Sequence, residues 1–260
     1  MTFSEITKIF KSNLDGYSNI FTLNGYQLPK DKDVYHKYMP VSTLRDYYNN
    51  NHITFVSPLL WTDPFETRYF KIKGYNAPNI FCMCLTDKQS QNEDAMWIRY
   101  AKPREEMVKV NIMIKPLLDY LEKSNITTYI GPAIYCSQKD IKKITKNNKL
   151  FFPPGNLQIE NYLTLMSLKR GAFAYENEVR LFVVPESPSG LSFSVSVSRL
   201  ADIINKITVS PYPVTCNCFP NPDSMSYLDK RKERTSFEFS GINTEASRLF
   251  KECPNCVLLP

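Results

Sequence analysis

Two glutamates and an arginine alternate along one segment of the chain, AYENEVRLFVV. We predict a β-strand over residues 172–185, in which Glu176, Glu178 and Arg180 point to the same face because successive side chains alternate. Carboxylates fixed in place can stabilise a positive charge that develops on a substrate. The alternative is an edge strand whose solvent face carries weak cross-strand ion pairs. The run LFVV that follows favours a central strand.

A second group of charges lies in the stretch WTDPFE, which follows the predicted strand HITFVSP. Trp61 and Phe65 flank a turn that contains Asp63, and Glu66 comes directly after Phe65. An aspartate in a turn typically hydrogen-bonds to the backbone two residues further on. Either this turn is an ordinary corner, or its carboxylates line a site.

A helix predicted over residues 92–101 carries three large side chains on one side, Met96, Trp97 and Tyr100. Met96 fits core packing. Trp97 and Tyr100 have polar tips, so they can pack against the core and still face a pocket.

Histidine chemistry is confined to two positions in the sequence. His36 and Tyr38 share a face of a strand predicted over residues 34–39, which keeps His36 as a candidate for proton transfer. His52 fits an ordinary exposed residue. Two histidines without an HExxH motif exclude a histidine-rich metal site.

Four of the seven cysteines form two short pairs, Cys216 with Cys218 and Cys253 with Cys256. Four thiols match an all-cysteine zinc site in ligand number. The long separation of the pairs leaves chance proximity of two loops as the alternative. Because the N-terminus lacks the pattern of a signal peptide, we expect a cytoplasmic protein with mostly free thiols.

The composition is that of an ordinary globular protein of 260 residues, with 43% hydrophobic and 22% charged residues. The eight glycines form neither GxGxxG nor GxxxxGK[ST], which argues against a Rossmann or P-loop nucleotide site. The sequence contains no apolar run of about 18 residues, so it predicts no membrane span. The net charge of +6 permits a nucleic-acid partner without demanding one.

Predicted strands and helices are mixed without strict βαβ alternation, which favours an α+β fold with mixed or split sheets and flanking helices. We predict a helical segment over residues 1–33, a core over 34–211 and a C-terminal extension over 212–260 that packs on the core. Within these parts, helices are predicted over 4–17 and 159–170, with Gly171 ending the second.

Three stretches resemble, in order and spacing, a large bacterial and phage family. They are FVSPLLWTDPFE, then FCMCLTD followed by DAMWIRYA, then LKRGAFAYENEVRLFVV. The family is domain-of-unknown-function family 2971, and the resemblance runs from about Tyr35 to Pro211. The order of elements is similar to that of ADP-ribosyltransferases, which is an analogy of fold.

This likeness implies an ADP-ribosyltransferase or NAD glycohydrolase that acts in phage–host conflict, as a toxin or in defence. Breaking the nicotinamide–ribose bond of NAD produces an oxocarbenium-like centre that a carboxylate stabilises. The resemblance implies that Glu178 takes this role, with Glu176 and His36 as further catalytic residues. Trp97 or Tyr100 would stack on the nicotinamide or adenine ring.

The remaining binding residues implied by the resemblance fall into two groups. Cations would meet the pyrophosphate, for which arginine offers a bidentate fork. Other side chains would form the pocket wall and rim, where Glu66 would bind Arg180 or orient the acceptor, a protein or a nucleic acid. The two groups are Lys37, Lys169 and Arg180, and then Tyr38, Asp63 and Glu66.

Two other functions would use the same residues. A non-enzymatic module that senses a nucleotide or a nucleic-acid end fits the positive charge and the abundant aromatic residues, which stack on bases. A metal-dependent nuclease would place Mg²⁺ on carboxylates, which are the ligands this ion prefers. Its candidate ligands are Asp63, Glu66, Glu176 and Glu178.

Overall fold

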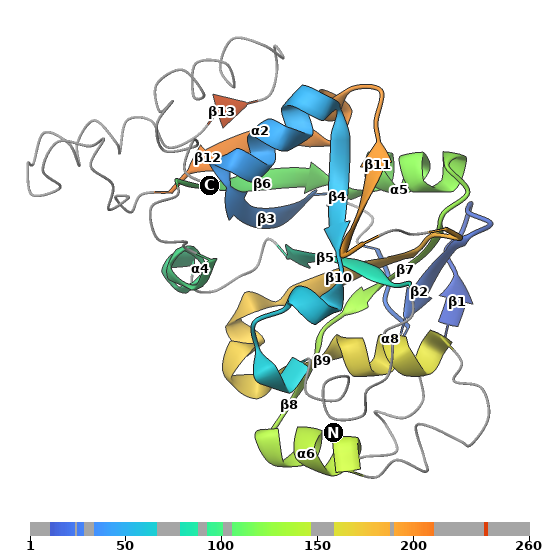
Figure 1. The fold of residues 1–260 in the computed structure, drawn as a ribbon, viewed down its shortest axis with the longest axis vertical. Coiled ribbons are helices and arrows are strands. Elements are labelled where there is room, and N and C mark those ends of the chain that lie inside the picture. Colours follow the sequence, from blue (N-terminus) through green and yellow to red (C-terminus); the bar gives the residue numbers. More distant parts are fainter. Residues whose placement is uncertain are drawn as a thin grey trace, which may run out of the picture. The chain divides into compact units, whose positions relative to one another are not determined.

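Figure 1 shows the protein as a computed structural model. The structure describes residues 11–23, 25–28, 34–66, 79–87, 93–100, 106–146, 159–187, 190–210 and 237–238. The chain forms two compact units, each built from three separate segments. Unit 1 contains residues 1–31, 54–90 and 118–195, and unit 2 contains residues 32–53, 91–117 and 196–260.

Strands and helices are mixed in both units, so the predicted α+β class is confirmed. The predicted domain boundaries, at residues 33 and 211, lie outside the described residues and stay predictions. No described helix has the length and apolar character needed to cross a membrane.

Unit 1 is built on a mixed sheet with the strand order β1-β2-β7-β10-β5. Its strands are β1 (Lys11–Asn13), β2 (Ile20–Leu23), β5 (Phe81–Thr86), β7 (Thr127–Pro132) and β10 (Glu178–Val184). The β2–β7 pair is parallel, and the other pairs are antiparallel. Because β10 lies between β7 and β5 and its first six residues are all buried, the edge-strand alternative for this segment is wrong.

Two further strands, most of whose residues belong to unit 1, extend this sheet. β4 (His52–Val56) pairs with β5 where Val56 lies opposite Cys82, and β11 (Ser192–Ser196) pairs with β4. A short 3₁₀ helix, η1 (Pro58–Leu60), follows β4.

Helices α6 (Gln138–Lys146) and α8 (Ile159–Ser167) also belong to unit 1. Phe182, Cys82 and Tyr129 lie opposite one another on adjacent strands and therefore share one face of the sheet. Buried residues of both helices join the same hydrophobic cluster, so α6 and α8 pack on this face. Figure 1 shows both helices on one side of the strands.

A small parallel pair of strands connects these parts. β8 (Ile134–Cys136) pairs with β9 (Leu168–Arg170), and η2 (Gly171–Glu176), a 3₁₀ helix, leads from β9 into β10. β9 begins directly after α8. The pairing of β9 with β8 places Lys169 opposite Tyr135, and the short η2 keeps it close to the start of β10.

Unit 2 contains an antiparallel sheet in the order β3-β6-β12-β13. Its strands are β3 (Val34–Pro40), β6 (Met107–Met113), β12 (Ile204–Val209) and β13 (Phe237–Glu238). Its helices are α2 (Val41–Asn50), α4 (Glu93–Tyr100) and the 3₁₀ helix η3 (Leu200–Asp202). Helix α5 (Ile114–Lys123) contributes residues to both units.

The helix predicted over residues 4–17 is wrong from Lys11 onward, and residues 1–10 lie outside the described part. Lys11 pairs with Leu23 in a β1–β2 hairpin. Gly16 in the connecting turn has φ +86°, a conformation that interrupts a helix and that glycine adopts without strain. Pairing with a neighbouring strand outweighed the helical spacing of the apolar residues.

The chain before β10 also differs from the prediction. The helix predicted over 159–170 ends at Ser167, because the next three residues pair with β8, so Gly171 begins η2 and does not end the helix. The strand predicted over 172–185 begins only at Glu178. Asn177 has φ 42°, a left-handed conformation that asparagine tolerates and that separates η2 from the strand.

We predict that Gly131→Ala destabilises the fold by about 1–3 kcal/mol, the usual cost of overpacking. A Cβ at Gly131 would lie 2.8 Å from the Cβ of Leu23, which is too close. The measurement is the free energy of unfolding in urea. Gly171→Ala is the matched control, since its Cβ would come no closer than 3.6 Å to a neighbour. Equal stability of the two variants would contradict the packing of β2 on β7.

Candidate functional site

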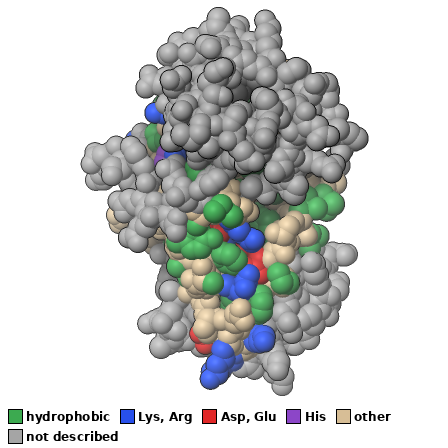
Figure 2. Space-filling view, turned by 90° about the vertical axis from the view of Figure 1, so that its left-hand side faces the viewer, with side chains coloured by type: hydrophobic (Ala, Val, Ile, Leu, Met, Phe, Trp, Pro, Cys, Tyr) green, Lys and Arg blue, Asp and Glu red, His purple; other side chains and the backbone are tan. Residues whose placement is uncertain are grey.

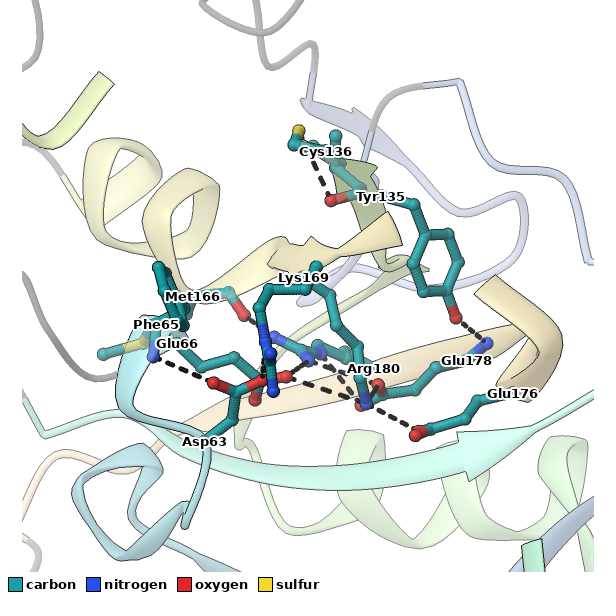
Figure 3. Close-up of polar contacts among 12 residues, drawn as sticks. Asp63, Phe65, Glu66, Tyr135, Cys136, Met166, Lys169, Glu176, Glu178 and Arg180 are labelled. Atoms are coloured by element: carbon teal, nitrogen blue, oxygen red, sulfur yellow. Dashed lines mark hydrogen bonds and ion pairs between the residues drawn. The ribbon is translucent and has the colours of Figure 1, made fainter. Parts of the chain in front are cut away.

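A group of seven charged side chains in unit 1, which we call the ionic cluster, gathers around the start of β10, and Figure 3 labels all of them except Arg170. They come from the corner at 61–66, from β9, from η2 and from β10. All except Arg170 are buried, with exposed fractions of 8% or less. The members are Asp63, Glu66, Lys169, Arg170, Glu176, Glu178 and Arg180.

Arg180 lies at the centre of the cluster and is 0% exposed. Its position on β10 is opposite Gly131 on β7 and Cys84 on β5, two small residues that leave room for a guanidinium. Its Nε donates to Glu178 Oε1 at 2.9 Å and its Nη2 donates to Glu178 Oε2 at 3.2 Å. This bidentate pair fixes the orientation of the Glu178 carboxylate.

Two neighbours outside the cluster also hold the guanidinium. Arg180 Nη1 donates to the carbonyl of Met166, in the last turn of α8. Carbonyls there lack partners within the helix, and the negative end of the helix dipole favours a cation. The Trp61 ring lies 4.3 Å from the Arg180 Cζ atom and adds a cation–π contact.

Lys169 joins both glutamates of the motif that the sequence singled out. Its Nζ donates to Glu176 Oε2 at 2.6 Å and also to Glu178 Oε2. The predicted strand alternation is not the reason that the two carboxylates converge, since Glu176 ends η2. The left-handed turn at Asn177 places both beside the same ammonium group.

The corner at 61–66 lies against this group, as Figure 3 shows. The backbone N–H of Phe65 donates to Asp63 Oδ1 at 2.9 Å, which confirms that Asp63 closes the turn. Glu66 Oε1 lies 3.3 Å from Arg180 Nη2, which confirms that Glu66 binds Arg180. It also lies 3.7 Å from the Nζ atom of Lys169. The corner is therefore part of the cluster.

Arg170 is the member that the sequence analysis missed. Its Nε donates to Asp63 Oδ2 at 2.9 Å. Its guanidinium carbon lies 5.1 Å from the centre of the Phe65 ring and 4.7 Å from that of Phe173. The sequence carried one signal for it, because the motif LKRG contains a second cation directly after Lys169.

The seven members alone comprise four carboxylates and three cations, one net negative charge among them when all are ionised, and Asp63 and Glu176 make further contacts beyond these pairs. Figure 2 shows one face of the molecule, on which Lys or Arg side chains lie next to Asp or Glu side chains among hydrophobic ones. In a buried site, neighbouring charges shift the pKa values of carboxyl groups strongly, because the low local dielectric weakens screening.

The two central carboxylates have pKa values shifted in opposite directions. Burial by itself raises the pKa of Glu178, but Arg180 and Lys169 outweigh it and lower that pKa to about 2. Burial also raises the pKa of Glu66, and here Arg180 and Lys169 compensate only in part. Glu178 is therefore ionised at every physiological pH, whereas Glu66 holds a proton more readily than an ordinary glutamate.

Tyr135 and Cys84 border the cluster. The Tyr135 hydroxyl accepts the backbone N–H of Glu178 at 2.8 Å, and burial raises the pKa of this tyrosine to about 12. A hydrogen bond with Cys82 and burial raise the pKa of the Cys84 thiol well above its ordinary value. Both groups therefore stay protonated at neutral pH, and Cys84 is a poor nucleophile.

The other predicted site residues belong to unit 2. His36 Nδ1 lies 2.9 Å from Asn111 Oδ1, directly opposite on β6. Tyr38 packs edge-on against Trp97 with ring centres 4.8 Å apart, and it stacks on Tyr100 at 5.9 Å. Trp97 is 4% exposed, which fits packing between β3 and α4. The roles of His36, Lys37, Tyr38, Trp97 and Tyr100 toward NAD stay predictions.

Metal binding has no support in the described part of the chain. No set of three or more histidine, cysteine, aspartate or glutamate side chains there is arranged to hold a metal ion. The predicted zinc ligands Cys216, Cys218, Cys253 and Cys256 lie outside the described residues. In the cluster, the ammonium group of Lys169 lies between Glu176 and Glu178, where a Mg²⁺ ion shared by them would have to bind.

Comparisons with protein-family models, with curated proteins and with solved structures found no match to this chain. The family membership and the analogy with ADP-ribosyltransferases therefore stay predictions from the three sequence motifs. The cluster joins two of them, because its residues come from the corner at 61–66 and from residues 169–180.

We predict that Arg180→Met destabilises the fold by about 3–5 kcal/mol, because it leaves the buried Glu178 without its main counter-charge. Unfolding in urea measures the effect. Arg199→Met is the control, since it removes an ion pair with Asp202 in which the arginine side chain is 61% exposed. Exposed pairs contribute about 1 kcal/mol or less. A loss for Arg180→Met as small as that of the control would contradict the buried pair.

We predict an acid-sensitive stability that depends on Glu178. Its pKa is lower in the folded protein than the ordinary 4.5, so ionised Glu178 stabilises the fold above pH 4.5. This contribution, roughly 3 kcal/mol, is lost as the pH falls from 4.5 toward 2. Urea unfolding of wild type and Glu178→Gln across this range measures it. The stability difference between the two proteins should shrink on acidification, and a constant difference would refute the assignment.

Proposed function

We propose that the protein consumes NAD, as an ADP-ribosyltransferase or NAD glycohydrolase, with Glu178 as the carboxylate that faces the ribose. One observation carries the proposal. Glu178 lies 2% exposed in a cluster with a surplus of negative charge, and its low pKa keeps it ionised. A fixed, desolvated carboxylate of this kind suits a reaction in which a sugar becomes positively charged.

The chemistry requires a cation to be stabilised for a short time. When the bond between nicotinamide and C1′ of the ribose breaks, its electron pair leaves with nicotinamide, which departs as a neutral molecule. The positive charge then lies on the ribose, across C1′ and the ring oxygen. An ionised carboxylate nearby stabilises this state more than the ground state, because the charge next to it has moved from the pyridinium ring to the sugar.

Substrate access to Glu178 requires one of its present contacts to open. Arg180 is 0% exposed and is held by Glu178, Met166 and Trp61. Lys169 is 6% exposed and carries its charge on a flexible stem. We therefore assign the opening to Lys169. Its departure would leave Glu178 Oε2 with the 3.2 Å bond from Arg180 Nη2 and with room to accept a hydrogen bond from the 2′-hydroxyl of the ribose.

We predict that Glu178→Gln lowers NAD cleavage by at least about 10²-fold, because the neutral amide cannot stabilise the ribosyl cation. Labelled NAD is incubated with the protein in the presence of protein, DNA or RNA acceptors. The measurements are release of nicotinamide and transfer of the label.

The control is Glu186→Gln, the same change at an exposed carboxylate outside the cluster. Circular dichroism and thermal unfolding establish that each variant is folded. Wild-type protein that leaves NAD intact with every acceptor would remove the proposal.

A second candidate function is a module that binds a nucleotide without turnover. The observation that favours it is the complete set of contacts around Glu178, since both carboxylate oxygens accept hydrogen bonds from cations. A nucleotide would then shift the unfolding temperature by mass action. Stabilisation by NAD or another nucleotide, with no nicotinamide released, would favour this module over the enzyme.

A further inference from the structure

We infer that Glu66 is the proton acceptor of the ionic cluster, and that it deprotonates the hydroxyl group or water that attacks the ribose. This inference rests on the proposed NAD-consuming function and adds a second catalytic carboxyl group to it. Its basis is the difference between the contacts of Glu66 and those of Glu178.

The carboxyl group of Glu66 is held more loosely than that of Glu178. Glu178 accepts hydrogen bonds from Arg180 and Lys169 on both oxygens. Glu66 makes two longer ion pairs, at 3.3 Å to Arg180 Nη2 and 3.7 Å to Lys169 Nζ, and both involve Oε1. Among the described residues, these are the polar contacts of its side chain. Oε2 is therefore the oxygen that can accept a proton.

The neighbouring carboxylates of Glu178 and Asp63 favour a proton on Glu66, because like charges close together repel. Arg180 and Glu178 face Glu66 from β10, Lys169 faces it from β9, and Asp63 faces it from the same corner. A proton costs least on the carboxyl group whose ion pairs are longest. The shortest ion pair of Glu66 is 3.3 Å, whereas Asp63, Glu176 and Glu178 each have one of 2.9 Å or less. The raised pKa of Glu66, next to the lowered pKa of Glu178, supports the same division of roles.

Each carboxyl group then has one task. The electron pair of the bond between C1′ and nicotinamide leaves with nicotinamide, while ionised Glu178 stabilises the ribosyl cation. An oxygen of the acceptor, either a hydroxyl group or water, forms a new bond to C1′. The proton of that oxygen passes to the Glu66 carboxylate, so charge and atoms balance. A base with a raised pKa accepts this proton more readily than an ordinary glutamate does.

The test is the pH dependence of NAD cleavage in wild type and Glu66→Gln. Wild-type activity should fall as the pH drops through the pKa of Glu66, because the protonated form cannot act as a base. Glu66→Gln should cleave NAD about 10²–10⁴-fold more slowly and should lack this acidic decline. Glu66→Asp keeps an ionisable carboxyl group, so it should retain the decline at a reduced rate. Glu186→Gln should match wild type.

A direct titration provides a measurement that does not depend on turnover. In protein labelled with ¹³C at glutamate Cδ, one resonance should titrate above the ordinary pKa of 4.5, and it should be missing in Glu66→Gln. If no such resonance exists, the inference is overturned.

The activity assay separates failure of the inference from failure of the proposed function. If wild type cleaves NAD and Glu66→Gln keeps both its rate and its acidic decline, the inference alone is wrong. If wild type never cleaves NAD, the proposed function fails and the catalytic role of Glu66 fails with it.

Discussion

The bidentate ion pair between Arg180 and Glu178, buried in the middle of a sheet, is the interaction on which the rest of unit 1 depends. Removing two charges from water costs several kcal/mol per ion, so a buried pair is tolerated only when further contacts surround it. Here those contacts come from the last turn of α8, from Lys169 on β9 and from Trp61 in the corner. Each of these elements must be in place for the pair to be compensated, so the pair couples their positions.

A hydrophobic group of similar volume would often stabilise such a location as well as an ion pair does. The cluster is therefore weak evidence of stability and better evidence of a charge-dependent task, because perturbed pKa values gather at functional sites. Two carboxylates with opposite shifts in pKa, Glu178 and Glu66, lie against the same guanidinium. This division supports one permanent charge and one exchangeable proton, the combination that our proposed reaction uses.

Several parts of the fold follow from local patterns. The strand predicted over residues 34–39, the helix predicted over residues 92–101 and the turn at Asp63 were predicted where the structure has them, because neighbouring residues alone decide them. The predictions failed at Lys11 and around residues 168–177, where short segments pair with strands distant in the sequence. Those hydrogen bonds outweigh the helical and strand propensities of the segments.

The sequence by itself singled out most of the charged residues of the cluster, Glu66, Glu178 and Arg180 from their types and spacing and Lys169 through the family resemblance. Only the tertiary structure decided their partners. Lys169 meets both glutamates because β9 pairs with β8 and Asn177 turns the chain, and Arg170 enters the cluster through Asp63, 107 positions away. Ion pairs depend on distances of a few ångströms between groups far apart along the chain, and residue types and spacing do not encode those distances.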